Sequence, residues 1–207
     1  MDWLANITLP YILAAVAVLA IARFCLGKYK SSMAKQASEI TESLLIAVVL
    51  VFLVIRPFIV QAFYIPSGSM LPTLYIRDHL LVNKFIYRFS EPKHGDIVVF
   101  KSPPGVSNDG QERDFIKRLM GVPGDVIQVK KGGVYRNGKR LKEPYLLEPQ
   151  IMYEMPPVKV PVGRLFVMGD NRNSSNDSHV WGTLDRNRVL GKALVRFWPL
   201  DRLGIPR

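Results

Sequence analysis

Two long apolar runs lie near the N-terminus of this chain. The first, Leu9 to Leu26, has eighteen residues and is interrupted only by Arg23, and the second extends from Leu44 to Val60. Runs of about 17–25 predominantly apolar residues are typical of transmembrane helices. The sequence therefore predicts a membrane anchor over residues 1–61, with spans at 9–26 and 44–60, followed by a separate body over residues 62–207.

Basic residues predict how these two spans are oriented. The intervening loop, residues 27–43, carries Lys28, Lys30 and Lys35, whereas the segment before the first span has Asp2 and no Lys or Arg. By the positive-inside rule the loop is cytoplasmic, and the N-terminus and the body lie outside. The acidic flank argues against a cleavable signal peptide, which is one alternative. The other alternative is a single anchor followed by a buried core helix.

The body is predicted to consist of short β-strands. Gly132-Gly133 and Asn137-Gly138 are hairpin signals, and fifteen prolines and fifteen glycines separate the apolar stretches. No helical period longer than about three turns is visible after residue 75. The clearest strand-like runs are 79–82, 96–100, 126–129, 134–136, 164–168 and 190–198. The fold class is therefore mainly β, a sandwich or barrel, anchored by two N-terminal helices.

Composition excludes several classes of protein. The net charge is +11, but the basic residues are spread along the chain and no nucleic-acid-binding motif presents them. Attraction to anionic lipid headgroups explains the charge without a nucleic-acid partner. The single cysteine, Cys25, excludes an internal disulfide framework and a cysteine-based zinc site.

Three polar segments carry the candidate chemistry. The first, Pro66 to Leu74, contains Ser67, Gly68 and Ser69 directly after the second apolar run. On its own it is consistent with a turn that ends a hydrophobic helix, but its prolines and glycine can also hold a serine hydroxyl in a fixed position. The second segment is Phe115 to Asp125, and the third is Gly169 to Gly182.

A serine needs a base to become a nucleophile, and two candidates are present. A Ser69–His179–Asp177 triad is one possibility. Lys117 is the other, because it follows Phe115 and Ile116 in a strand-like run, and an apolar setting can hold a lysine neutral. The third segment taken alone is also consistent with a cation-binding loop, for example for calcium.

The order and residue types of these three segments, placed after a second apolar run, resemble bacterial type I signal peptidases. Gly95 to Lys101 and the closing Phe197-Trp198-Pro199 are similar to that family as well, so the resemblance extends from Arg56 to Trp198. It implies a membrane-bound serine endopeptidase that removes signal peptides from exported preproteins at Ala-x-Ala sites. It implies no metal and no organic cofactor.

The resemblance also implies a role for each matching residue. Ser69 is the nucleophile and Lys117 the general base of a Ser-Lys dyad, and Ser67 forms the oxyanion hole with the backbone N–H of Ser69. Ser175 orients Lys117. Arg118, Asp170, Arg172 and Asp177 form a supporting polar network. The substrate pockets are lined by Phe63, Ile65, Leu74 and Ile116.

The chain departs from the common bacterial pattern at two places. Most bacterial members have Arg at the position of His179, and some cyanobacterial and plastid relatives resemble this chain there. A histidine makes any pairing with Asp177 dependent on pH. Only 52 residues separate Lys117 from Asp170, so the β-ribbon insertion, about 126–165, is expected to be short. The expected location is a bacterial plasma membrane, or a thylakoid membrane for a cyanobacterial or plastid member.

Two further classes of protein remain as alternatives. One is an inactive membrane-anchored β module that binds exported chains. The other is a Ser-Lys self-cleaving protease like the SOS-response repressors, in which a DNA-binding domain stands where this chain has its two apolar runs.

Overall fold

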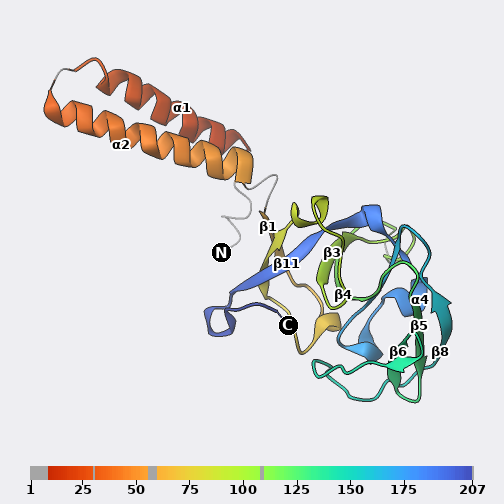
Figure 1. Cartoon of the computed structure of the whole chain (residues 1–207). Coiled ribbons are helices and arrows are strands. Elements are labelled where there is room, and N and C mark those ends of the chain that lie inside the picture. Colours follow the sequence, from red (N-terminus) through yellow and green to blue (C-terminus); the bar gives the residue numbers. More distant parts are fainter. Residues whose placement is uncertain (1–8, 30, 56–59, 108–109, 207) are drawn as a thin grey trace. The chain divides into compact units, whose positions relative to one another are not determined.

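The computed structural model describes residues 9–29, 31–55, 60–107 and 110–206. These belong to two compact units, residues 1–61 and residues 62–207 (Figure 1). The first unit is helical and the second is built mainly of strands, so the predicted mainly β body is confirmed.

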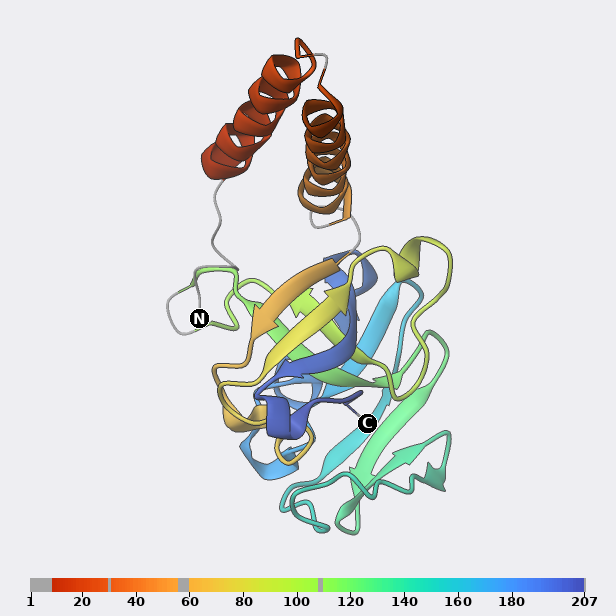
Figure 2. The same cartoon turned by 90° about the vertical axis from the view of Figure 1, so that its left-hand side faces the viewer.

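The N-terminal unit contains two helices that lie side by side (Figures 1 and 2). Helix α1 covers Leu9–Leu26, helix α2 covers Ser32–Val49, and the π-helical segment η1 continues to Ile55. The Ser31 side chain caps α2 by accepting a hydrogen bond from the Ala34 N–H at 3.1 Å. An ion pair of 2.8 Å between Arg23 and Glu42 connects the two helices.

The bounds of the second helix correct the sequence prediction. α2 begins twelve residues before the predicted span at 44–60, inside the range predicted as a loop, and Val60 belongs to a strand. Residues 56–59 of that predicted span lie outside the described residues. No helix in the described part of the chain is both long enough and apolar enough to cross a membrane. The two spans are therefore not confirmed.

The larger sheet of the second unit has seven strands in the order β1-β2-β11-β3-β4-β9-β10. The pairings given for β2, β3, β4, β9, β10 and β11 are all antiparallel. Its strands are β1 Val60–Tyr64, β2 His79–Asn83, β3 Ile97–Lys101, β4 Asp114–Gly121, β9 Arg164–Met168, β10 Leu184–Asp185 and β11 Val189–Trp198. Strand β4 therefore lies between β3 and β9, and it carries Lys117 and Arg118 into the interior of the domain.

The smaller sheet has four strands in the order β7-β6-β5-β8. They are β5 Val126–Lys130, β6 Gly133–Arg136, β7 Lys139–Arg140 and β8 Met155–Lys159. Lys131 and Gly132 both have positive φ, as do Asn137 and Gly138, which is the backbone of two-residue hairpin turns. The first turn is therefore one residue earlier than the predicted Gly132-Gly133. β8 contains two prolines and occupies an edge of the sheet, where a missing N–H is tolerated.

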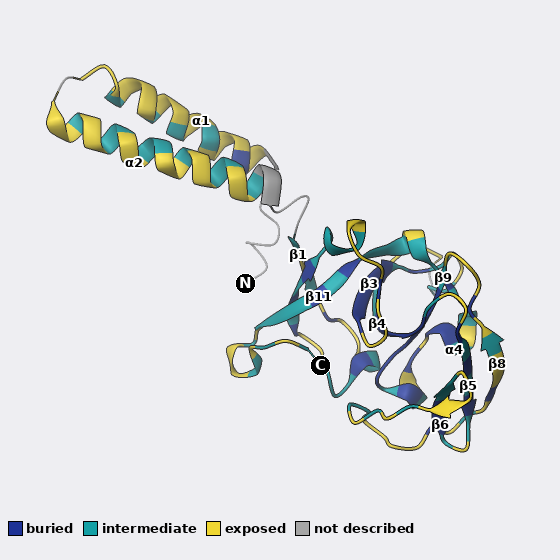
Figure 3. Cartoon of the chain, viewed as in Figure 1, coloured by how far each residue is buried: buried dark blue, intermediate teal, exposed yellow. Residues whose placement is uncertain are grey.

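Buried apolar side chains form three clusters in the second unit. Figure 3 marks the buried residues of this unit in dark blue. One cluster joins the two sheets through Ile127 and Val134 of the smaller sheet and Phe166 of the larger sheet. Another contains Met70 and Leu74, which follow β1, together with Leu80 of β2. The turn between β1 and β2 is thus anchored in the interior by its own apolar residues.

Candidate active site

The turn that carries Ser67 and Ser69 is held by the buried side chains of the residues that follow them. Met70 and Leu74 are fully buried, whereas Ser67 is exposed and Ser69 is half-buried. The one-turn helix η2, Gly68–Met70, places the two serines at the surface of the domain. The segment is thus a fixed turn that presents hydroxyl groups, which is the alternative that its prolines and glycine allowed.

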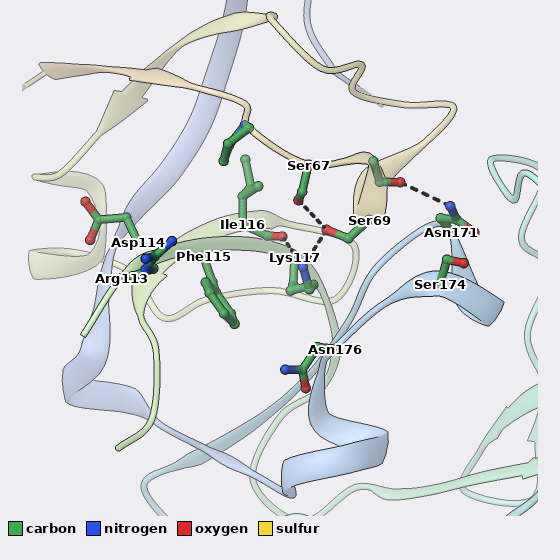
Figure 4. Close-up of a pocket in the computed structure, with 12 residues that line it drawn as sticks. Ser67, Ser69, Arg113, Asp114, Phe115, Ile116, Lys117, Asn171, Ser174 and Asn176 are labelled. Atoms are coloured by element: carbon green, nitrogen blue, oxygen red, sulfur yellow. Dashed lines mark hydrogen bonds between the residues drawn. The ribbon is translucent and has the colours of Figure 1, made fainter. Parts of the chain in front are cut away.

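The structure brings Ser69 and Lys117 together, although they are 48 positions apart in sequence. Lys117 Nζ lies 2.7 Å from Ser69 Oγ and 3.1 Å from the carbonyl oxygen of Ile116. Ser67 Oγ lies 3.5 Å from Ser69 Oγ, and the three side chains point toward one another (Figure 4). A nucleophile and a base within hydrogen-bond distance are the basic requirement for covalent catalysis by serine.

Burial prepares Lys117 to act as that base. Its side chain is 4 % exposed, and removal from water lowers the pKa of the ammonium group to about 8 from an ordinary value of 10.5. The negative charges of Asp177 and Asp170 oppose this effect, but desolvation prevails. A lysine with a pKa near 8 is substantially neutral at mildly alkaline pH and can accept a proton.

The segment after β9 packs directly against the serine turn. The Asn171 backbone N–H donates to the Ser69 carbonyl at 3.1 Å, and its side-chain Nδ2 donates to the Gly68 carbonyl at 3.2 Å. A side chain on Gly169 would have no space, because a Cβ there would stand 2.3 Å from the Ser69 carbonyl oxygen and 2.3 Å from Ser175 Oγ. Asn171 and Gly169 therefore fix the backbone on which Ser69 is mounted.

Ser175, predicted to orient Lys117, lies in this same segment. Its hydroxyl oxygen is buried, and within the described part of the chain it has no hydrogen-bond partner. Its role in orienting Lys117 remains a prediction.

Four charged residues form a buried cluster beside the serine turn, which we call the ion-pair cluster: Arg118, Asp170, Arg172 and Glu143. Arg118 Nε and Nη2 donate to the two carboxylate oxygens of Asp170 at 2.8 and 2.6 Å. Arg172 Nη2 and Nη1 donate to the two carboxylate oxygens of Glu143 at 2.8 and 3.1 Å, and Arg172 Nε donates to the Gly169 carbonyl at 2.8 Å. Both pairs are bidentate, which gives buried charges their strongest and most directional contacts.

Asp177 and His179 form a second polar group behind Lys117. The Asp177 carboxylate accepts hydrogen bonds from the Gly169 N–H at 2.8 Å and from the His179 N–H at 3.1 Å, and His179 Nδ1 lies 2.7 Å from it. The His179 ring stacks on Tyr153 with their centroids 4.1 Å apart. In the described residues His179 is thus bound to Asp177 and Tyr153, and Ser69 is bound to Lys117 and Ser67, which favours the dyad over the triad.

A cavity of about 560 Å³ opens in front of the two serines. Phe115 and Ile116 of β4 line it together with Lys117, and three polar residues of the segment after β9 complete the wall: Asn171, Ser174 and Asn176 (Figure 4).

Of the four residues predicted to line the substrate pockets, Ile116 borders this cavity. Ile65 and Leu74 are buried in the cluster around Met70, and Phe63 lies on β1. Their direct contact with a substrate stays a prediction.

The third polar segment does not assemble a metal site in the described residues. No group of three or more His, Cys, Asp or Glu side chains there stands close enough to hold a metal ion. The carboxylates of Asp170 and Asp177 are instead bound to Arg118 and to the Gly169 N–H, respectively. The interpretation of this segment as a calcium loop therefore has no support from the geometry.

Four residues of the site had no predicted role: Glu143, Tyr145, Tyr153 and Asn171. Glu143 and Tyr145 lie between β7 and β8, and the Tyr145 ring faces the Arg118 guanidinium at 3.8 Å. Their sequence neighbourhood is an unremarkable polar loop, so no local signal could have found them. Asn171 was detectable in principle, since it stands between Asp170 and Arg172, which both had predicted roles.

Comparison with known proteins gives consistent matches. The family described as signal peptidase, peptidase S26, matches residues 37–198. A probable signal peptidase I-2 of Synechocystis is 47 % identical over 167 residues, which cover 81 % of this chain and 76 % of the relative. A probable thylakoidal processing peptidase 2 of Arabidopsis thaliana is 42 % identical over 75 % of this chain and 43 % of its own length. The crystal structure of a signal peptidase I from Enterococcus faecalis superposes with a TM-score of 0.42, at 28 % identity, over 50 % of this chain and 97 % of that chain.

Proposed function

Because the chain belongs to the signal peptidase family, peptidase S26, and is thus a serine endopeptidase that removes signal peptides, we propose that Ser69 and Lys117 carry out the cleavage. The observation that carries the proposal is the 2.7 Å contact between Lys117 Nζ and Ser69 Oγ. It is made by a lysine whose pKa burial lowers to about 8. Nucleophile and base are therefore adjacent, and the base is poised to accept a proton.

The reaction begins with neutral Lys117, which takes the proton of the Ser69 hydroxyl as Oγ attacks the scissile carbonyl. The resulting oxyanion is stabilised by the Ser67 hydroxyl and the Ser69 N–H. Lys117 then gives the proton to the leaving amine, which departs as the N-terminus of the mature protein. Lys117 next activates a water molecule, which hydrolyses the acyl-enzyme and releases the signal peptide. Every proton transfer in this scheme involves Lys117, and no metal or organic cofactor takes part.

The substrate is proposed to bind as an added strand. In the described residues β4 pairs with β9 only from Arg118 onward, so the edge of Asp114 to Lys117 that faces the cavity carries no neighbouring strand. An extended peptide there would gain main-chain hydrogen bonds. The apolar side chains of Phe115 and Ile116 would leave room for small residues at alternate positions, which accounts for an Ala-x-Ala preference.

We propose that helices α1 and α2 anchor the catalytic domain in a lipid bilayer, with the N-terminus and the domain on the extracytoplasmic side. Exposed apolar side chains along both helices support this, among them Leu13, Val18, Phe24 and Leu44. Only seven residues separate Gln61 from Ser69, which would keep the nucleophile near the outer surface. The relatives from Synechocystis and Arabidopsis favour a bacterial plasma membrane or a thylakoid membrane.

The deciding experiment compares the full-length chain in detergent with three variants: Ser69→Ala, Lys117→Met and His179→Ala. Cleavage of a preprotein with an Ala-x-Ala site is followed by gel shift and by sequencing of the new N-terminus. We expect no cleavage by Ser69→Ala or Lys117→Met and substantial cleavage by His179→Ala. Undiminished activity in Lys117→Met would refute the dyad, and loss in His179→Ala with retention in Lys117→Met would establish the triad.

A further inference from the structure

The smaller sheet contains a hairpin whose charge the proposed reaction does not use. We call residues 126–142, which form β5, β6 and β7, the basic hairpin. It holds six basic residues and no Asp or Glu: Lys130, Lys131, Arg136, Lys139, Arg140 and Lys142. In the described part of the chain none of them forms an ion pair with a carboxylate, whereas Arg118 and Arg172 do. The positive charge of the hairpin is therefore uncompensated.

Strand register places part of this charge on one face. Gln128 lies opposite Tyr135, Lys130 opposite Gly133, and Tyr135 opposite Arg140. Residues that lie opposite one another, or two apart on a strand, share a face of the sheet. Lys130, Tyr135 and Arg140 therefore share one face. Val126 lies opposite Lys159 of β8, which adds a third cation to it.

The other face of the hairpin is occupied by the interior of the domain. Ile127, Val129 and Val134 are fully buried there. The cationic face consequently points away from the interior. Its aromatic and basic groups are in contact, with Lys130 Nζ 4.8 Å from the centroid of the Tyr135 ring. The Arg140 guanidinium packs against Gly133, where a Cβ would stand 2.7 Å from Nε.

A single loop connects the catalytic cavity to this hairpin. Ser174 lines the cavity, and the adjacent Asn173 donates to the Gln150 carbonyl at 3.0 Å and accepts from the Met152 N–H at 2.8 Å. On its other side the same loop meets the hairpin turn, where the Ile151 N–H donates to the Gly132 carbonyl at 3.2 Å. The carboxylate of Glu148, also in this loop, is bound by Asn173 Nδ2.

The two sides of the cavity differ in polarity. On the side of β4, Phe115 and Ile116 supply apolar side chains next to the charged Arg113 and Asp114, while the segment after β9 contributes the uncharged polar residues Asn171, Ser174 and Asn176 (Figure 4). Small apolar residues before the cleavage site fit the first side. A substrate whose residues before the cleavage site lie against β4 would direct the polypeptide after the site across the polar side, toward the loop that carries Gln150 and the basic hairpin beyond it.

We propose that the cationic face formed by Lys130 and Arg140 of the basic hairpin and by Lys159 of the adjacent β8 binds acidic segments in the mature part of the preprotein. The inference rests on the proposed function, because that function supplies the polypeptide that leaves the cavity. Carboxylates on an extended chain complement unpaired ammonium and guanidinium groups, and the Arg140 guanidinium can donate two parallel hydrogen bonds to one carboxylate. Preproteins that are acidic shortly after their cleavage site are thus the preferred substrates.

Binding is tested first, without catalysis. The full-length Ser69→Ala protein in neutral detergent is titrated with two fluorescent peptides that share an Ala-x-Ala site, one followed by four acidic residues at positions 5 to 12 after the site and one with uncharged residues there. We expect Lys130→Glu/Arg140→Glu to weaken the acidic peptide about tenfold and the uncharged peptide less than twofold. The preference for the acidic peptide should diminish between 50 mM and 500 mM salt.

A matched control separates local from overall charge. Lys84→Glu/Arg88→Glu makes the same change of net charge on the segment after β2, outside the hairpin, and we expect it to leave both peptides within twofold of the parent protein. An equal loss in this control, an equal loss of the uncharged peptide, or no loss of the acidic one would overturn the proposal. The proposal would also be overturned if Lys130→Glu/Arg140→Glu lost binding to vesicles of anionic lipid but bound the acidic peptide as the parent protein does.

A second measurement uses the active protein. The ratio of kcat/KM for an acidic preprotein to kcat/KM for an uncharged preprotein is expected to fall about tenfold in Lys130→Glu/Arg140→Glu. Replacing the acidic residues of that preprotein by lysines should restore its cleavage by this variant. Failure of the wild-type chain to cleave either substrate would refute the proposed function. The binding experiment with Ser69→Ala would still decide the role of the hairpin.

Discussion

Lys117 and Arg118 are neighbours on β4, yet the regions that surround them differ in kind. On one side, Lys117 is buried against a serine hydroxyl and a backbone carbonyl, and burial lowers its pKa to about 8. On the other side, Arg118 is equally buried, but one edge of its guanidinium donates to both carboxylate oxygens of Asp170 and Nη1 donates to the Gly95 carbonyl, under the ring of Tyr145. Lys117 is thus bound by neutral oxygen atoms in the described contacts, whereas Arg118 is bound by a carboxylate.

Activity and stability are thus assigned to different members of one strand. A lysine that is costly to bury in its charged form can serve as a base. An arginine with a bidentate carboxylate partner stays charged and holds two distant segments together. Five substitutions or measurements test this division, beginning with the largest expected effect.

Lys117→Met should lower kcat/KM by about 10⁴-fold or more, since the only base of the proposed dyad is removed. Below pH 8 the unfolding free energy of the same variant should exceed that of the wild type by about 3 kcal/mol. This is the free energy that corresponds to lowering the pKa of Lys117 from 10.5 to about 8 by burial. The sign follows because the unfolded state binds the proton more tightly, so wild-type stability increases as the pH rises from about 8 to 10.5. Urea unfolding at pH 6 and pH 10.5 measures this gain and its disappearance. A variant that is less stable at pH 6 would contradict it.

Asp170→Ala should cost about 3–5 kcal/mol of unfolding free energy, because Arg118 is left buried without its partner. The Thr73 hydroxyl, which donates to the same carboxylate at 2.5 Å, also loses its acceptor. Denaturant unfolding of the full-length chain in detergent, followed by tryptophan fluorescence, measures the loss. The double variant Arg118→Met/Asp170→Leu is the control, and it should recover most of the stability since neither member of this pair is left buried without its partner. Failure to recover would show that the pair stabilises through more than its charges.

Ser67→Ala should lower kcat by about 10²–10³-fold with little change in KM, as expected for a donor that acts on the oxyanion. Stability should be unchanged because the Ser67 side chain is exposed. Ser174→Ala is a suitable control, since Ser174 lines the same cavity without contacting Ser69 Oγ in the described structure. An equal loss in both variants would remove the special role of Ser67.

The pH profile should reflect Lys117 directly. Below its pKa of about 8 the base is protonated, so kcat/KM should rise about tenfold per pH unit from pH 6 and level off above pH 8. A profile that is already flat between pH 6 and 8 would show that Lys117 is not the titrating base.

His179→Ala has the smallest expected effect. Without the ring that contacts it at 2.7 Å, the Asp177 carboxylate attracts a proton on Lys117 more strongly, so the rising limb moves to higher pH. Activity at pH 7 should fall about two- to threefold, and the plateau above pH 9 should be unchanged. His179→Arg is the matched variant, and it should move the limb in the opposite direction or not at all. A loss that persists on the plateau would point to a structural role.

Much of the fold was readable from local patterns. The strands around 79–82, 126–129 and 164–168 were predicted within one residue, because alternation and turn residues determine them locally. β8 was missed because its two prolines are acceptable only at a sheet edge, a property that depends on tertiary context. The start of α2 was missed because its first half is polar, although Ser31 offered an N-cap signal.

The residues of the site likewise divide into those that the sequence reveals and those that it does not. The serine turn and Lys117 were recognisable from residue types in order, and the structure joins them. Glu143 was not recognisable, because its role is to pair with Arg172, 29 positions later in the chain. Its neighbours in sequence give no indication of that ion pair. Long-range ion pairs of this kind depend on how the two sheets pack, which a single sequence does not encode locally.

Gly169 has a consequence for the interpretation of sequence variants in this protein. It touches neither substrate nor Lys117 in the proposed mechanism, and it contributes no side chain. Yet its N–H binds Asp177, its carbonyl binds Arg172, and its bare Cα stands directly against the Ser69 carbonyl. Adding one methyl group here would displace the nucleophile from its base without altering any catalytic group. Alanine at this position should therefore be classed with the loss-of-function substitutions, although substitution tables rate it among the mildest changes.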